Sequence, residues 1–267
     1  MIKFFRRIRK RLLAENKLSK YLLYAIGEIF LVVIGILIAL QINNWNEENK
    51  NEKAEYNFYK EILSDLEKDN RKLAGLKVFY NNRIEHAGWL LKKVRNPALP
   101  IDKIEFGKHV QPLYYGPLPV TYTSSFEAAK SSGVFGYFKN KKILKTLNQY
   151  YADFDELKGI MEATLRWLEI DLEPIMSKIP EYYITAESGD YALASELHGN
   201  KGFYEYVARI EDNRNIVFDL KSYLQKPAFG YYLTGDLGRS FNALESLEIR
   251  LAQLAAIKNE IEEYVAE

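Results

Sequence analysis

The chain has 267 residues, of which 48% are hydrophobic, so it is long enough for one domain of ordinary size plus a membrane anchor. Lys and Arg (37) nearly balance Asp and Glu (36), but residues 1–20 hold eight basic residues and one acidic residue, a net charge of +7, which leaves −6 for the remainder. This local positive charge argues against a nucleic-acid partner, and the lack of cysteine excludes disulfides, thiolate catalysis and cysteine-bound metals.

Residues 21–42 are predicted to form a transmembrane signal anchor, with residues 1–20 as its basic cytoplasmic tail. The twenty residues from Tyr21 to Leu40 include one charged residue and would span about 30 Å as a helix, the thickness of a bilayer's hydrocarbon core. No small-x-small cleavage site follows this apolar run, which favours an uncleaved anchor over a signal peptide. A buried helix of a soluble core is the remaining alternative, although uninterrupted apolar runs of this length are uncommon there.

The charges on either side of this segment predict its orientation. The tail of +7 precedes it, whereas residues 43–53 carry three Glu and two Lys, a net charge of −1. Because positively charged flanks stay in the cytoplasm, we expect residues 43–267 on the far side, which is the periplasm in a bacterium. No later segment approaches twenty apolar residues, so the sequence predicts a single-pass protein of the inner membrane with the lipid bilayer as one partner.

One carboxylate, Glu28, lies inside the anchor, about 10 Å deep at helical rise. At helical spacing it shares a face with Val32, Gly35 and Ala39, and Tyr24 lies one turn before it. Because small residues allow helices to approach closely, this face is predicted to pack on another transmembrane helix, from a second copy or a partner protein. Two alternatives remain open: a protonated Glu28 bonded to Tyr24 or a backbone carbonyl in a monomeric anchor, and a proton relay.

Beyond the anchor, apolar residues at steps of three and four predict a long amphipathic helix, which the prolines of residues 96–100 would end. Asp102 is expected to open a short helix. A capping box of Ser124 and Glu127 predicts another short helix, and Gly133 would end it.

A second long helix is expected to begin after Asn140 and to kink or end at Pro174. Residues 178–202 are interpreted as a loop, residues 203–225 as a third amphipathic helix and residues 237–264 as the last helix. The expected fold class is therefore all-α, with an N-terminal transmembrane helix followed by an antiparallel bundle of about four main helices.

No pattern in the chain indicates catalysis, a cofactor or a metal. His109 follows Glu105 by four residues, but a metal needs three or four ligands, and His86 and His198 lie apart from them in sequence. Nucleophile-elbow, zincin, phosphate-loop and dinucleotide motifs are absent, and Ser124 is assigned to capping rather than to nucleophilic chemistry. We therefore expect no catalytic residue, no cofactor-binding residue and no metal ligand.

Tyrosine is frequent, with 20 residues in the chain. Four tyrosines in two predicted connectors, Tyr114, Tyr115, Tyr231 and Tyr232, are expected to meet at the membrane-distal end of the bundle. Tyrosine-rich loops make favourable contact surfaces, so these residues are candidates for a partner-binding tip. The alternative is that they fill the open end of the bundle.

Two stretches carry a resemblance to a known family. The first contains "MIKFFRRIRK", "KYLLYAIGEI" with Glu28, and "LVVIGILIALQINNWN" with Trp45. The second is "TYTSSFEAAKSSGVFGYFKNKKILKTLNQYY", residues 121–151. Together they resemble an uncharacterised family of Bacteroidota envelope proteins, known only as a domain of unknown function. The resemblance implies a location and a lineage, and it brings no activity with it.

The sequence favours a non-enzymatic envelope protein whose helical bundle mediates interaction with a partner protein or assembly with itself. The alternative is a periplasmic ligand sensor or binding domain that signals through the span with a partner. An envelope enzyme is a third hypothesis, which the lack of a catalytic motif disfavours.

Overall fold

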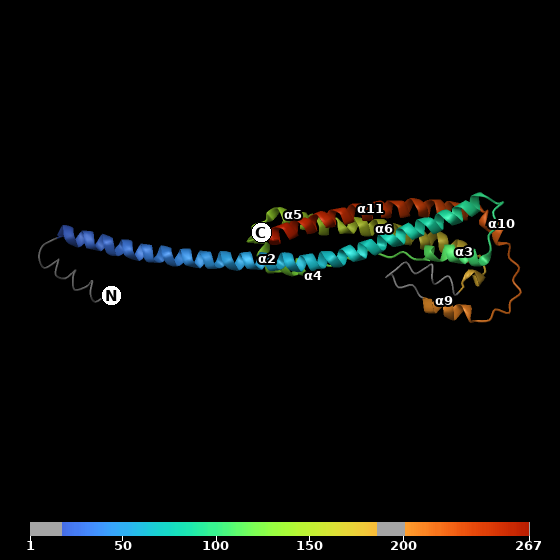
Figure 1. The fold of residues 1–267 in the computed structure, drawn as a ribbon, viewed down its shortest axis with the longest axis horizontal. Helices are drawn as coiled ribbons and strands as arrows, with labels where there is room; N and C mark the ends of the chain where they lie inside the picture. The colour runs from blue at the N-terminus through green and yellow to red at the C-terminus, as the bar shows by residue number, and fades with distance from the viewer. Residues whose placement is uncertain (1–17, 186–200, 267) are drawn as a thin grey trace. The chain divides into compact units, whose positions relative to one another are not determined.

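The computed structural model describes residues 18–185 and 201–266, and all regular secondary structure in these ranges is helical (Figure 1). The all-α fold class is therefore confirmed. In chain order the helices are α2 (Leu18–Arg95), α3 (Lys103–Val110), η1 (Gln111–Tyr114), α4 (Ser124–Ser132), η2 (Val134–Gly136), α5 (Lys141–Ala152), α6 (Phe154–Trp167), the π-helical η3 (Leu168–Leu172), α7 (Glu173–Met176), η4 (Glu181–Tyr183), α9 (Lys201–Ala208), α10 (Leu220–Leu224) and α11 (Pro227–Ala266).

The chain divides into two compact units, each described by itself. The first comprises Met1–Asn57 and Gly136–Lys139, and the second comprises Phe58–Phe135 and Asn140–Glu267. Helix α2 contributes to both units.

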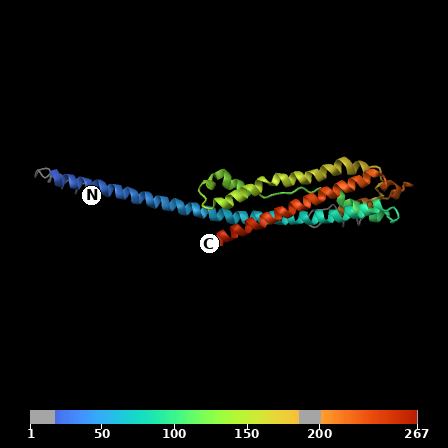
Figure 2. The same ribbon diagram turned by 90° about the horizontal axis from the view of Figure 1, so that it is seen from above.

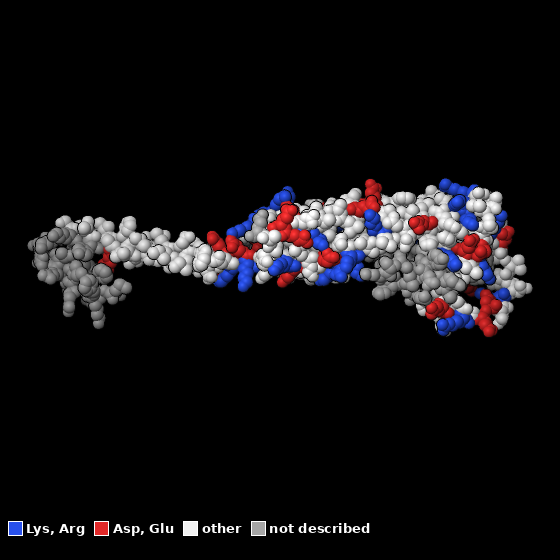
Figure 3. Space-filling view, in the orientation of Figure 1, with Lys and Arg blue, Asp and Glu red and all other residues white. Residues whose placement is uncertain are grey.

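In the first unit, α2 is an apolar helix whose side chains are exposed. Consecutive residues from Ile29 to Ile34 are all exposed, so the helix is uncovered on every side there. In Figure 3 this stretch is almost free of charged side chains, whereas both signs of charge are interspersed over the second unit. Among the described residues, α2 is the one helix long and apolar enough to cross a membrane, which makes it a candidate single span or signal.

The short segment Gly136–Lys139 is bound to the last turns of α2 in the first unit. The Lys139 backbone N–H donates to Glu55 Oε2 at 2.7 Å, and the Lys139 ammonium pairs with Glu52. Glu55 is itself buried, so its carboxylate needs this bond.

In the second unit, α2 and α11 run antiparallel. Three polar pairs show the register, because the residue number rises along α2 as it falls along α11: Glu67 with Lys258, Lys77 with Glu248, and Arg83 with Asp236. Helices α5 and α6 follow one another along α11 (Figure 2). The three long runs bury the apolar faces that the sequence predicts.

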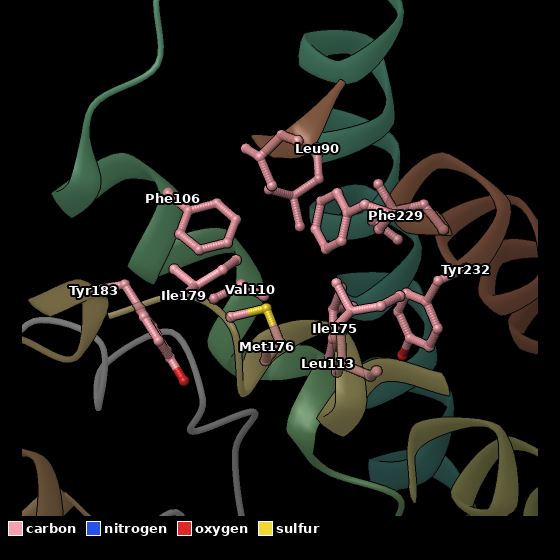
Figure 4. Packing of buried hydrophobic residues seen from close by; sticks show 14 of the residues in the cluster. Leu90, Phe106, Val110, Leu113, Ile175, Met176, Ile179, Tyr183, Phe229 and Tyr232 are labelled. Carbon is pink, nitrogen blue, oxygen red and sulfur yellow. The ribbon is translucent and has the colours of Figure 1, made fainter. Parts of the chain in front are cut away.

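A large apolar cluster closes one end of this unit. The side chains of Leu90, Phe106 and Phe229, which come from α2, α3 and α11, converge there on residues after η3 (Figure 4). The other members labelled in Figure 4 are Val110, Leu113, Ile175, Met176, Ile179, Tyr183 and Tyr232. Tyr183 lies at the edge of the cluster with its hydroxyl pointing away from Phe106.

Several helix ends follow the local signals in the sequence. Helix α2 ends at Arg95, just before the prolines that were predicted to end it. Asp102 accepts hydrogen bonds from two N–H groups in the first turn of α3, and Asn140 accepts one from the first turn of α5. Gly133 adopts φ 75° after α4, the left-handed conformation that glycine allows at a helix C-terminus.

The predicted capping box at Ser124 and Glu127 is wrong, because a residue far away in sequence caps α4. Asp65 of α2 accepts hydrogen bonds from the Ser125 N–H (3.3 Å) and hydroxyl (2.7 Å), and from the Ser124 hydroxyl (3.4 Å). The carboxylate therefore sits at the N-terminus of α4, where negative charge is favoured.

Asp69, one turn further along α2, holds the preceding residues of the same connector. It accepts hydrogen bonds from the Thr121 hydroxyl (2.7 Å), the Tyr122 N–H (2.7 Å) and the Tyr150 hydroxyl (3.1 Å). Burial raises the pKa of the Asp69 carboxyl, and these three bonds oppose that rise.

The third predicted helix, residues 203–225, is not formed as one helix. Helices α9 and α10 are separated by a non-helical stretch in which Asp212 accepts from the Arg214 N–H, and Asp219 caps α10. The last helix begins at Pro227, ten residues before the predicted start. The described part of the second unit thus has three long helical runs instead of four main helices.

Helix α11 packs closely against Trp167 at Gly235. A Cβ atom on Gly235 would lie 2.6 Å from Trp167 Cζ2, so no larger residue fits at this position. Proline is favourable in the first turn of a helix, which suits Pro227.

Gly235→Ala should destabilise the protein by about 1–3 kcal/mol, because the new methyl group displaces the Trp167 ring. Gly238→Ala is the matched control, since a Cβ there has no neighbour within 4 Å. It should be neutral or stabilising by up to about 1 kcal/mol. Chemical unfolding of the full chain in detergent, followed by circular dichroism, measures both. Equal effects of the two substitutions would contradict the packing role of Gly235.

Candidate functional site

A buried ion pair joins three elements of the second unit. Arg83 of α2 and Asp236 of α11 are both fully buried, and Arg83 Nη2 lies 2.5 Å from Asp236 Oδ1. Arg83 Nε also donates to this carboxylate, at 3.1 and 3.2 Å. Burial alone would lower the pKa of Arg83, but the Asp236 carboxylate holds it above its usual value.

The remaining donors of Arg83 bind the backbone around η1. Nη1 donates to the carbonyl oxygens of Pro112 (3.2 Å) and Tyr115 (2.6 Å), and Nη2 donates to that of Leu113 (3.1 Å). Three carbonyl groups around the short η1 therefore share a charged donor. The connector that carries Tyr114 and Tyr115 is thereby fixed to α2.

Four tyrosines meet on the outer side of this connector. The Tyr114 and Tyr183 hydroxyls lie 3.2 Å apart, and those of Tyr115 and Tyr204 lie 2.8 Å apart. The Tyr204 hydroxyl also donates to Oε1 of Gln111 at 2.8 Å. A cavity of about 320 Å³ opens between these residues, and it is also lined by Ile184 and Phe203.

The four tyrosines of the predicted tip do not form one cluster. Tyr114 and Tyr115 line the cavity, whereas Tyr231 and Tyr232 belong to the first turns of α11 instead of a connector. Tyr231 is 67% exposed beside Trp167, and a contact of Tyr231 with a partner stays a prediction.

Tyr232, unlike Tyr231, is fully buried. Its hydroxyl lies 3.2 Å from Asp236 Oδ1 and 3.4 Å from Arg83 Nη2. Tyr232 therefore offers no surface to a partner, and the alternative, in which it fills the bundle, applies to it.

Sequence reasoning did not group Tyr183 and Tyr204 with Tyr114 and Tyr115. Tyr183 lies in η4 and Tyr204 in α9, far from the η1 connector in sequence. The frequency of tyrosine was the one available signal, and it does not indicate which rings meet.

The described residues of the predicted packing face of the anchor are accessible in the first unit. Val32 is 57% exposed, Ala39 is exposed, and a Cβ on Gly35 would have no neighbour within 4 Å. Glu28 is partly exposed, and the side chain of Tyr24 lies outside the described set.

Two of the three histidines, His86 of α2 and His109 in the last turn of α3, contact each other. The Nδ1 atoms of His86 and His109 lie 2.9 Å apart, and the Trp89 ring stacks on His109 with ring centroids 3.8 Å apart. Burial lowers the pKa of His86; burial and the neighbouring His86 lower that of His109 to about 4.

The other two residues considered as metal ligands, Glu105 and His198, do not join this pair in the described part of the chain. Glu105 lies 3.9 Å from the Lys93 ammonium, and His198 falls outside the described residues. Within residues 18–185 and 201–266, no three His, Asp or Glu side chains are arranged to hold a metal ion. The histidine pair is thus a neutral contact between α2 and α3 near pH 7.

These features define an all-α protein with a candidate membrane span and a helical unit built around a buried charge. Residues 28–152 match the model of the Family of unknown function (DUF6090). The match begins at Glu28 and ends at Ala152, the last residue of α5, so it includes the first stretch from Glu28 onward and the whole of the second. No curated protein and no solved structure matches the chain.

Removing either partner of the buried pair should cost about 3–5 kcal/mol of unfolding free energy, since it leaves a charge unpaired in the core. We expect this for Arg83→Met and for Asp236→Leu. The double variant should cost less than the sum of the two, but it should keep a loss of about 1–3 kcal/mol because the η1 carbonyls lose their donor.

Urea unfolding of the full chain in detergent, followed by tryptophan fluorescence, measures these values. The exposed pair Lys77 and Glu248 also joins α2 to α11 and serves as the control. Lys77→Met and Glu248→Leu should each cost at most about 1 kcal/mol. Strictly additive losses for Arg83 and Asp236 would show that the two side chains do not act as a pair.

Proposed function

We propose that the protein is a single-span membrane protein of the bacterial envelope that acts by binding a partner protein or a second copy of itself, and not by catalysis. Its short basic tail would remain in the cytoplasm and its helical unit would face the periplasm. The observation that carries this proposal is the apolar surface of α2 in the first unit.

The extent of this surface supports a membrane location. Soluble monomers rarely expose contiguous apolar patches beyond a few hundred Å², because the cost in water is large. Large apolar side chains of α2 are exposed throughout the segment, from Leu22 to Trp45: Leu22, Leu23, Ile26, Ile29, Phe30, Leu31, Val32, Val33, Ile34, Ile36, Leu37, Ile38, Leu40, Ile42 and Trp45. Lipid or another apolar helix has to cover them. The charge of +7 before the segment supports a cytoplasmic N-terminus.

The use of polar side chains in the second unit supports binding over catalysis. The Ser124 and Ser125 hydroxyls donate to Asp65, and the His86 and His109 rings contact each other through Nδ1. These two hydroxyls and two imidazole rings are thus engaged in contacts between helices.

The face with Glu28, Val32, Gly35 and Ala39 is the proposed contact for another transmembrane helix. Gly35 supports this choice, because an added Cβ would meet open space, so a neighbouring backbone can approach closely there. Leu37 lies on the opposite face of the same helix at helical spacing, and it would face lipid.

A photoreactive amino acid in place of Gly35 should crosslink to a protein in the membranes of cells that make the full chain. The same amino acid in place of Leu37 should give mainly lipid adducts, which makes it the matched control. Mass spectrometry of the adducts identifies the neighbour and separates a second copy from a different protein. Lipid adducts alone at both positions would refute the packing face.

A further inference from the structure

The tyrosine-lined cavity has features of a small-molecule site. Its walls come from the η1 connector, the end of η4 and the start of α9, and four of its seven lining residues are tyrosines. None of the described lining residues carries a formal charge: they are Gln111, Tyr114, Tyr115, Tyr183, Ile184, Phe203 and Tyr204. Ligand sites are commonly cavities of about 300–1,000 Å³ with aromatic walls and a few polar groups, and this cavity of about 320 Å³ falls in that range.

One wall of the cavity is held rigidly from behind. The Tyr115 and Leu113 carbonyl oxygens accept hydrogen bonds from the buried Arg83. The connector therefore cannot move without breaking bonds to a buried charge, which costs several kcal/mol. A wall held in place in this way lowers the entropy that a ligand must overcome on binding.

The hydrogen bonds along the wall leave polar groups for a ligand. Tyr204 donates its single proton to Gln111, so Tyr115 must donate to Tyr204. The amide nitrogen of Gln111 then has two N–H groups with no acceptor among the described residues, although Gln111 is only 4% exposed. The Tyr114 and Tyr183 hydroxyls share one hydrogen bond, which uses the proton of one hydroxyl. The proton of the other hydroxyl remains available for a ligand.

Gln111 lines the cavity, so a ligand or water there can supply an acceptor to its amide nitrogen. The donors of Gln111 and of the Tyr114 and Tyr183 pair require oxygen acceptors on a ligand. Flat aromatic walls favour the face of a ring. A charged ligand would find no counter-charge among the described lining residues and would lose its hydration.

We propose that this cavity binds a small, uncharged ring compound that presents a carbonyl or hydroxyl oxygen to Gln111. Neutral sugars and neutral aromatic amides share this chemistry, and the volume accommodates one or two rings. This site goes beyond the proposed function, since it depends neither on the span nor on a protein partner.

The test uses the full chain in detergent and saturation-transfer NMR with two matched probe pairs. N-acetylglucosamine is compared with the cationic glucosamine, and 4-hydroxybenzamide with the anionic 4-hydroxybenzoate. At least one neutral probe should bind saturably, and at least about tenfold more tightly than its charged counterpart. The arm that responds distinguishes a sugar from an aromatic ligand. No saturable binding of either neutral probe, or equal binding of the charged ones, overturns the proposal.

Variants locate the binding in the cavity. Gln111→Leu removes the donors, and Phe203→Ala removes part of a wall at a half-exposed position that tolerates truncation. Each should weaken binding of the responding probe by about tenfold while circular dichroism stays unchanged. Tyr206→Ala is the control, because Tyr206 is 68% exposed on α9 and does not line the cavity. Unchanged binding in Phe203→Ala, or equal loss in Tyr206→Ala, places the probe elsewhere and refutes the site.

Discussion

The buried guanidinium of Arg83 is the constraint on which the second unit depends. A charge removed from water must be paired and hydrogen-bonded, and Arg83 meets this demand by binding Asp236 and three carbonyl groups around η1. These bonds fix the register of α11 against α2 and hold the connector after α3. The position of the tyrosine-lined cavity and the burial of Tyr232 both follow from this arrangement.

Carboxylates of α2 likewise hold the next connector along the chain by hydrogen bonds. Asp65 and Asp69 lie one turn apart and bind residues 121–125 by side-chain and backbone hydrogen bonds. Both carboxylates and this connector fall within residues 28–152, which match the family of unknown function. Two segments of the matched region are therefore joined directly, whereas the partner of Arg83 on α11 lies beyond that region. Helix α2 acts as the common support to which the shorter elements attach.

The sequence was informative wherever a signal is local. Asp102, Asn140 and Gly133 act within one turn of their own helices, so their roles could be predicted from neighbouring residues. Contacts between distant segments could not be read in the same way. Asp65 takes over the capping predicted for Ser124 from 59 residues away, and the partner of Gln111 in the cavity, Tyr204, is 93 residues away. Likewise, only the contact with Trp167 reveals why a glycine suits position 235 of α11.

The account of function depends on α2 crossing a membrane, so the most direct measurement is the side on which each end of the apolar segment lies. The chain has no cysteine, which gives a clean background for labelling with a membrane-impermeant maleimide. Ser19→Cys and Glu48→Cys place one exposed thiol at either end of the segment. In cells with a permeable outer membrane, the account predicts labelling at position 48 without lysis and at position 19 only after lysis. Labelling of both positions before lysis, or of position 19 alone, would contradict it.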